Sequence, residues 1–199
     1  MLFFLMLFAM TRMSAADKAV VTAGMESSLK TKAAKVEAGR DRFQQKEKEA
    51  AAIMNLRDSV EHGKLANQAK IAVTDQTVKI TLNPSDFFAT GSAQITSSTQ
   101  SALESLVAPL RAFPNDIIIE GHTDNIPMHG GGYSSNWELS VARAVSVIDF
   151  FTSKGLAPRE LIAGGYGEYH PAFPNDDDAN RARNRRIEIT ILRQPGGSQ

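Results

Sequence analysis

The stretch at residues 117–143, IIIEGHTDNIPMHGGGYSSNWELSVAR, decides how we expect the chain to fold. Three isoleucines at residues 117–119 form a β-branched run that predicts a buried strand. Gly121 ends this run, and a long loop rich in glycine and proline follows it. Thr123 and Asp124 are therefore expected where a buried strand runs into a loop, a place at which polar side chains are free to meet a ligand.

A helix is expected after this loop. Ser134 or Ser135 is a suitable N-cap for a helix that begins near Asn136. At about 100° per residue, Asn136 and Arg143 fall within about 20° of each other, with Leu139 on the same side. We expect the core stripe to lie on a different side, formed by Trp137, Val141, Ala144, Ile148 and Phe151.

Asp124 and Arg143 then carry opposite charges toward one cleft. A guanidinium binds a carboxylate through two parallel hydrogen bonds, and a carboxylate binds an ammonium. A ligand that carries both an ammonium and a carboxylate would suit this pair. The alternative from the residues alone is that Asp124 and Arg143 pair with each other or cap a helix.

The rest of the C-terminal part alternates strands and helices. Such alternation predicts an α/β (α+β) domain with helices packed on one mixed sheet. The expected elements are two strands within residues 70–83, a helix at 96–112, a strand at 162–166, a short helix at 179–184 and a last strand at 187–191.

Four motifs in this region resemble the OmpA-like peptidoglycan-binding domain. They are GHTDNIP, SSNWELSVARA, GYGEYHP and NRARNRRIEI, and together they cover about residues 71–192. The form SSNWELS, placed after a long insertion behind TDNIP, looks like the flagellar stator subfamily of MotB and PomB. Because all four motifs occur in the family's order, the resemblance is specific.

The resemblance implies a non-catalytic anchor that binds the diaminopimelate of the cell-wall stem peptide. Asp124 would hold the ammonium, and Arg143 would hold the carboxylate. The remaining candidate site residues are Thr123, Asn136, Leu139, Asn184 and Arg185. The implied partners are peptidoglycan, a MotA-like channel subunit and a second copy of the chain. The alternative within the family is a general cell-wall anchor of the envelope or of a secretion system.

The N-terminus begins with the apolar run MLFFLMLFAM. Ten residues are too few to cross a bilayer, which needs about 20. We expect residues 1–13 to be part of a transmembrane helix whose start lies upstream, with a signal peptide cleaved near residues 14–16 as the alternative. The resemblance then implies a single-pass inner-membrane protein with its C-terminal domain in the periplasm.

Residues 14–68 are rich in Ala, Lys, Glu and Gln and contain no proline, which predicts a helical linker. A thin apolar stripe is expected at Phe43, Ala50, Ile53, Met54 and Leu56. The resemblance implies a channel plug at residues 14–29, and the alternative from the residues alone is a solvated helical linker. We expect residues 69–194 to fold as a domain without this region, and residues 195–199 to be a tail.

Composition and spacing argue against several other functions. The chain has no cysteine and a formal net charge of zero, so neither a disulfide nor a nucleic-acid partner is expected. Its four histidines lack metal-ligand spacing, and His122 is expected to be a hydrogen-bonded loop or core residue. No phosphate loop, nucleophile elbow or pair of catalytic carboxylates is found, so we expect no enzyme, cofactor or metal.

Overall fold

A computed structural model of the chain describes residues 15–66, 68–83, 87–128 and 132–193. The predicted membrane segment at 1–13 and the tail at 195–199 lie outside these residues. Within the described ranges, no helix is both long enough and apolar enough to cross a membrane. The chain divides into two compact units, Met1–Lys48 and Glu49–Gln199.

Helix α2, Ala15–Glu61, confirms the helix predicted from composition. Pairs four residues apart support it, such as Glu26 with Lys30 at 2.9 Å. The predicted apolar stripe is confirmed at Leu56, which is 0% exposed, and is wrong at Phe43 and Met54, which are 63% and 72% exposed. Ala50 is exposed as well. Within the second unit, the end of α2 instead buries the face that carries Ala52, Leu56 and Val60, because this face packs into the domain core.

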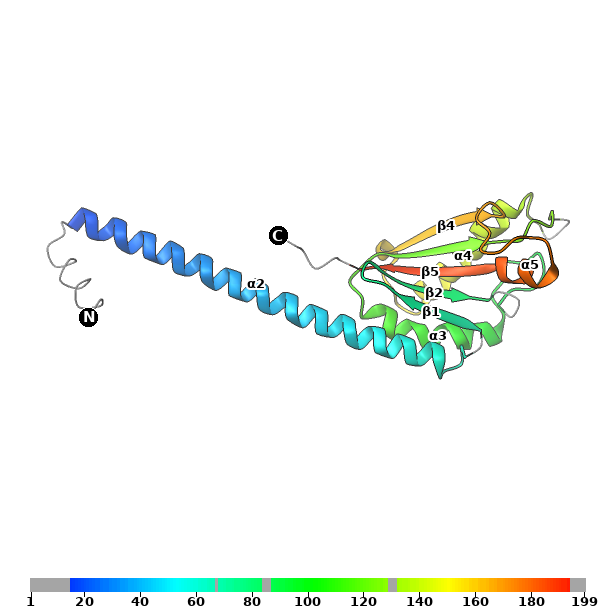
Figure 1. Ribbon diagram of the computed structural model, residues 1–199, viewed down its shortest axis with the longest axis horizontal. Helices are drawn as coiled ribbons and strands as arrows, with labels where there is room; N and C mark the ends of the chain where they lie inside the picture. Colours follow the sequence, from blue (N-terminus) through cyan, green and yellow to red (C-terminus); the bar gives the residue numbers. More distant parts are fainter. Residues whose placement is uncertain (1–14, 67, 84–86, 129–131, 194–199) are drawn as a thin grey trace. The chain divides into compact units, whose positions relative to one another are not determined.

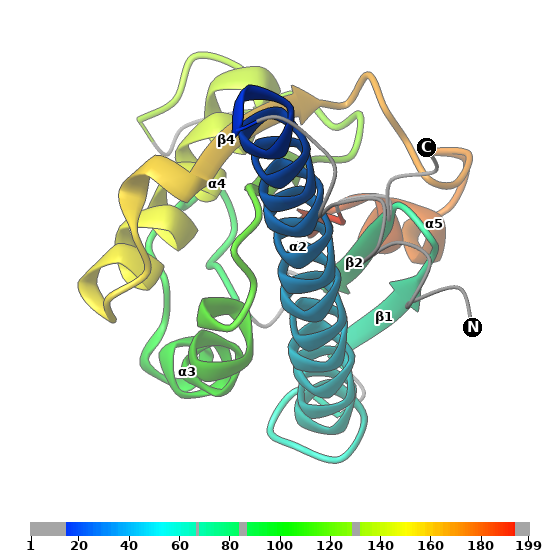
Figure 2. The same cartoon turned by 90° about the vertical axis from the view of Figure 1, so that its left-hand side faces the viewer.

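Five strands form one mixed sheet in the order β1-β2-β5-β3-β4. Strands β3 and β4 run parallel, whereas β1 with β2, β2 with β5, and β3 with β5 are antiparallel. The neighbours β1 and β2 lie side by side in both views (Figures 1 and 2). The strands are β1 Ala69–Val73, β2 Thr77–Leu82, β3 Ile117–His122, β4 Leu161–Gly167 and β5 Arg186–Leu192. The predicted fold class is confirmed.

The core lies between one face of this sheet and the helices. Alternate residues of β2, β3 and β5 are buried on that face, for example Ile80, Ile119 and Ile189, each 0% exposed. Leucines of α3 and the residues Val147 and Phe151 of α4 pack against them. The helices are α3 Ser97–Arg111, α4 Asn136–Ser153, the 3-10 turn η2 Pro158–Glu160 and α5 Asp178–Asn184.

The loop that follows β3, the start of α4 and helix α5 lie at the same end of the sheet (Figure 1). This arrangement follows from the topology, because β3 runs into that loop while α5 leads directly into β5. The sequence motifs that are far apart along the chain therefore meet at one end of the domain.

The predicted core stripe of α4 is wrong at Trp137, which is 52% exposed. The buried face of α4 instead includes Asn136, Ser140 and Arg143. The reason is the close approach of α4 to the strands: a Cβ added at Gly121 would lie 2.1 Å from the Ser140 carbonyl oxygen. Small residues on both sides of this contact turn the polar face of α4 inward.

Candidate functional site

Asp124 lies in the first turn after β3 and is 6% exposed. Its Oδ1 accepts a hydrogen bond from the Ile126 amide at 3.1 Å, which fixes the side chain in a local turn. Its Oδ2 accepts a hydrogen bond from Arg185 Nη1 at 2.6 Å, so the two side chains form an ion pair. Asp124 is thus paired with Arg185, which differs from the Asp124–Arg143 pair that the sequence left open. An ionised carboxylate has about four acceptor sites, so this carboxylate still has room for a ligand ammonium.

Arg143 lies on the inward face of α4 and is 5% exposed. Its Nε donates to the Ser92 carbonyl oxygen at 2.9 Å, and its guanidinium carbon lies 5.1 Å from the centre of the Phe88 ring. Among the described residues, no acceptor binds its Nη1 or Nη2. These two nitrogens form the fork that a carboxylate recognises.

The three charges influence one another. Burial lowers the pKa of Arg143 from its ordinary value, and the positive charge of Arg185 lowers this pKa further, while the negative charge of Asp124 raises it. An arginine remains charged even so. One guanidinium group is bound to the Asp124 carboxylate and a second is affected by its charge. This excess of positive charge favours an anionic group of a ligand at Arg143. We call Asp124, Asn136, Arg143 and Arg185 the Asp124 cluster.

Asn136 fastens the loop beside Asp124. Its Nδ2 donates to the carbonyl oxygens of Asp124 and Ile126 at 3.3 and 2.9 Å, and to Glu168 Oε2 at 2.9 Å. The Ser135 side chain caps α4 by accepting from the Glu138 amide, as the sequence predicted, so Asn136 lies at the first position of the helix. All its donor capacity is used within the protein, which assigns Asn136 a positioning role.

The predicted site residues Thr123, Leu139 and Asn184 are buried and help to hold the Asp124 cluster in place. Thr123 and Leu139 are each 3% exposed, and the Thr123 hydroxyl donates to the Asp124 carbonyl oxygen at 2.9 Å. Asn184 is fully buried and bonds both the amide and the carbonyl of Phe173 at 2.9 and 2.7 Å. It therefore holds the loop before α5 and fixes the position of the next residue, Arg185.

Sequence reasoning missed Phe88, Ser92 and Glu168. Phe88 and Ser92 hold the Arg143 guanidinium, and Glu168 holds Asn136. The sequence did contain a signal for Glu168, because this residue is part of the GYGEYHP motif. The two contacts to Arg143 had no signal of their own, since a backbone carbonyl and a ring face leave no pattern in a sequence.

His122 differs from the expectation of a hydrogen-bonded side chain. It is 4% exposed, and among the described residues neither of its ring nitrogens has a hydrogen-bond partner. Its ring stacks on Tyr166 with centroids 5.2 Å apart. Burial, together with the nearby charge of Arg186, lowers the pKa of His122 to about 4. The side chain is therefore neutral at neutral pH.

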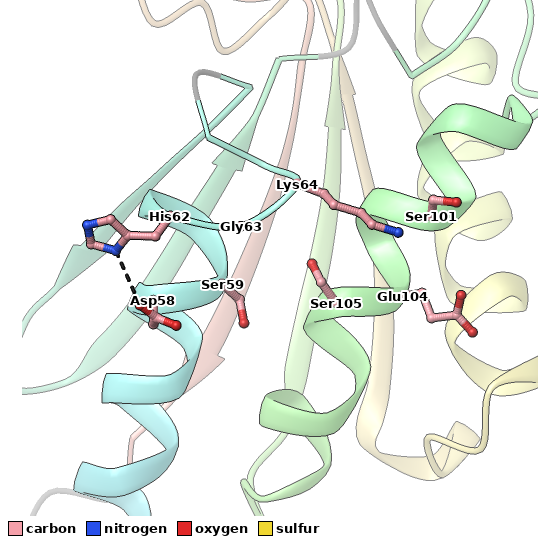
Figure 3. A pocket seen from close by; sticks show the side chains of 8 residues that line it. All are labelled: Asp58, Ser59, His62, Gly63, Lys64, Ser101, Glu104 and Ser105. Atoms are coloured by element: carbon pink, nitrogen blue, oxygen red, sulfur yellow. Dashed lines mark ion pairs between the residues drawn. The ribbon is translucent and has the colours of Figure 1, made fainter.

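A polar hollow of about 410 Å³ lies between the end of α2 and helix α3 (Figure 3). His62 pairs with Asp58 at 3.2 Å on one side, and Lys64 reaches over it toward α3. No residue that lines it belongs to the Asp124 cluster. Within the described part of the chain, no three His, Asp or Glu side chains come together as a metal site.

The class of protein follows from the fold and from the place of these motifs. Residues 87–185 match the model of the OmpA family, and all members of the Asp124 cluster fall within this range. The chain therefore carries a domain of the OmpA family, which confirms the predicted resemblance.

Within this family the chain is similar to motility protein B. It is 37% identical to motility protein B of Bacillus subtilis (strain 168) over 132 residues, which cover 65% of this chain and 50% of that protein. The chain spans only half to just under two thirds of the length of such curated relatives.

Two solved structures resemble the domain closely. A protein from Desulfovibrio vulgaris described as MotB-like has a TM-score of 0.67 and 28% identity, covering 76% of this chain and 99% of that one. The cell wall anchor of the T6SS from Pseudomonas aeruginosa has a TM-score of 0.65 and 29% identity, covering 70% and 97%.

Proposed function

We propose that this chain is a non-catalytic anchor that binds the diaminopimelate residue of peptidoglycan at the Asp124 cluster. The observation that carries the proposal is Arg143, a buried guanidinium whose Nε is already bound to Ser92 while both terminal nitrogens have no partner among the described residues. A desolvated cation held in one orientation is suited to a single carboxylate. The negative charge of Asp124 acts on the pKa of Arg143, and a ligand carbon that carries both an ammonium and a carboxylate would bind to both residues.

The pair Asp124–Arg185 supports this function. Arg185 holds the Asp124 carboxylate in one orientation through the hydrogen bond to Oδ2. The incoming ammonium would share this carboxylate with Arg185, while the ligand carboxylate would bind the fork of Arg143. Asn136, Thr123 and Leu139 then contribute by holding the loop and the start of α4 in place.

The test is binding of the full chain to isolated cell walls. Asp124→Ala and Arg143→Ala are each expected to weaken binding about 30-fold or more, because breaking a desolvated charge contact costs about 2–5 kcal/mol. Arg143→Lys is expected to bind nearly as poorly, since an ammonium lacks the two-pronged contact. Walls built on lysine in place of diaminopimelate should bind weakly, because lysine lacks the second carboxylate.

Controls separate lost binding from lost folding. Arg159→Ala removes an arginine whose side chain is 85% exposed on η2, and it should bind walls like the parent chain. Asp124→Asn keeps the shape of the side chain and allows Oδ1 to accept from Ile126, so it should fold normally and still bind poorly. Wall binding by folded Asp124→Asn and Arg143→Lys at the parent's affinity would refute the assignment.

At the level of the cell, the role that fits the similarity to motility protein B is the anchoring of a flagellar stator. In that role the chain would lie in the inner membrane through a single N-terminal helix, with its second unit in the periplasm, and would act as a homodimer with a MotA-like channel subunit. Residues 14–29 would form the plug of the ion channel.

The similarity to the cell wall anchor of the T6SS favours a second candidate, a wall anchor unrelated to the flagellum. Loss of motility on deletion of the gene distinguishes the two.

A further inference from the structure

Two large aromatic side chains lie exposed next to the Asp124 cluster. Trp137, on the first turn of α4, is 52% exposed, and Tyr169, in the loop after β4, is 68% exposed. Their ring centroids are 5.8 Å apart with an interplanar angle of 51°. Exposed rings of this size are costly to leave in water and are enriched at binding surfaces. We call Trp137 and Tyr169 the aromatic pair.

The aromatic pair is connected to the cluster by its chain neighbours. Trp137 follows Asn136, and Tyr169 follows Glu168, and these two neighbours are hydrogen-bonded to each other at 2.9 Å. Asn136 in turn donates to the Asp124 carbonyl oxygen at 3.3 Å. The two rings are thus held one residue away from Asn136 and Glu168, the residues that position the loop carrying Asp124.

The backbone under the rings is also firmly packed. A Cβ added at Gly167 would lie 3.1 Å from the Trp137 amide nitrogen, so the end of β4 rests directly on the start of α4. The Tyr169 amide donates to the Tyr166 carbonyl oxygen at 3.1 Å, which closes the turn that carries the second ring. A surface prepared in this way loses little entropy when a ligand binds.

We propose that the aromatic pair is a sugar-binding subsite that stacks on the glycan strand of the cell wall. One face of a pyranose ring presents C–H groups, which pack against the electron-rich face of an aromatic ring. The Glu168 carboxylate and the Tyr169 hydroxyl belong to adjacent residues of the loop after β4, and such groups suit the hydroxyl groups at the rim of a sugar. The subsite rests on the proposed function, because that function brings a glycan to this surface.

The short length of a stem peptide favours a sugar as the ligand of the aromatic pair. An extended peptide advances about 3.3–3.6 Å per residue, so a stem peptide only a few residues long spans on the order of 10 Å. A diaminopimelate bound at Asp124 and Arg143 therefore keeps the sugar that carries its stem peptide close to the domain. The aromatic pair offers two exposed rings within one residue of Asn136 and Glu168, which position the Asp124 loop.

The chain offers a direct reporter, since Trp137 is its single tryptophan. The full chain is titrated with glycan strands from which an amidase has removed all peptide, and the fluorescence of Trp137 is followed. Stacking should shift or quench the emission. Tyr169→Ala should weaken this binding about five- to tenfold, as removal of one stacked ring predicts. Ile162→Ala, which trims a side chain that is 45% exposed on β4, should leave it unchanged.

A second titration separates this proposal from the first. Free stem peptide that contains diaminopimelate should bind the parent chain and Tyr169→Ala equally, and should lose binding in Asp124→Asn. Peptide-free glycan should bind Asp124→Asn as well as it binds the parent. If peptide-free glycan leaves the emission unchanged while stem peptide binds, the sugar subsite is refuted and the Asp124 assignment stands. If the glycan binds and the stem peptide does not, the sugar subsite stands and the Asp124 assignment fails.

Discussion

Removing the end of α2 should strongly destabilise the domain, although the sequence alone places the domain boundary at residue 69. In the second unit, Leu56, Val60 and Leu65 are at most 1% exposed and belong to the same core as the sheet. Burial of a large apolar side chain stabilises by about 1.5–3 kcal/mol, so losing these three costs about 5–9 kcal/mol. This is comparable with the whole stability of an ordinary domain, about 5–15 kcal/mol.

A polar contact adds to this loss. Glu49 Oε1 accepts a hydrogen bond from Arg193 Nε at 2.5 Å, and Arg193 also donates to the Thr74 carbonyl oxygen. The start of the second unit is therefore tied to the residue after β5. A chain that begins at residue 69 loses this ion pair together with the apolar contacts.

The assay is urea unfolding followed by far-ultraviolet circular dichroism, with residues 49–199 compared with residues 69–199. The longer piece should unfold in one cooperative transition, and the shorter one should have a much lower midpoint or no native baseline. In the full chain, Leu56→Ala should cost about 2–5 kcal/mol. Met54→Ala is the matched control on the same helix, because Met54 is 72% exposed, and it should cost less than about 0.5 kcal/mol.

Unfolding free energies of the two pieces within about 1 kcal/mol of each other would refute a stabilising role for the end of α2, because this difference is smaller than the burial free energy of a single one of these side chains. In that case the boundary at residue 69 is the correct one. The end of α2 would then be an ordered extension that adds little to the stability of the domain.

Two further predictions concern buried residues near the site. His122 has a pKa lowered to about 4 by burial, so below pH 6.5 the unfolded chain binds the proton more readily, and stability should fall by about 3 kcal/mol between pH 6.5 and pH 4. His122→Phe, which keeps the stack on Tyr166, should remove this part of the pH dependence in urea titrations; an unchanged slope would contradict the assignment. Gly121→Ala brings a Cβ within 2.1 Å of the Ser140 carbonyl oxygen and should lower stability by about 3 kcal/mol or more, together with wall binding. Gly164→Ala, whose nearest contact is 3.5 Å, is its control in thermal unfolding and should cost about 1 kcal/mol or less; equal losses in both variants would speak against the close contact.

Much of the fold could be predicted because the signals are local. Three consecutive isoleucines, a serine N-cap and alternating isoleucines near the C-terminus each predicted an element that the structure contains. The placement of Asp124 after a strand and of Arg143 on the facing helix came from the same signals together with the family motifs. In the structure, the negative charge of Asp124 does act on the pKa of Arg143.

The remaining features depend on contacts between distant segments. A helical wheel places Trp137 in the core because it is apolar, yet the neighbours of α4 decide which side is buried. The same holds for Phe43 and Met54 on α2, which looked like parts of a buried stripe and are exposed. Among the described residues His122 has no hydrogen-bond partner for its ring nitrogens. Tyr166, which stacks on its ring, and Arg186, which lowers its pKa, lie far from it in the sequence.

The close contact between α4 and the strands, which contradicts the helical-wheel prediction for Trp137, also positions the site residues. Gly121 and Gly165 have no side chains to hold α4 away from the sheet, and a Cβ added at Gly165 would lie 2.7 Å from the Ser140 Oγ. That hydroxyl accepts a hydrogen bond from the Gly167 amide at 3.0 Å, so the small residues of both elements form one interlocked contact. Because Ser140 faces the strands, Asn136 one turn before it and Arg143 one turn after it face inward as well. A larger residue at Gly121, Gly165 or Ser140 would push α4 away from the sheet. The guanidinium of Arg143 would then lose the desolvated environment in which it can bind a carboxylate.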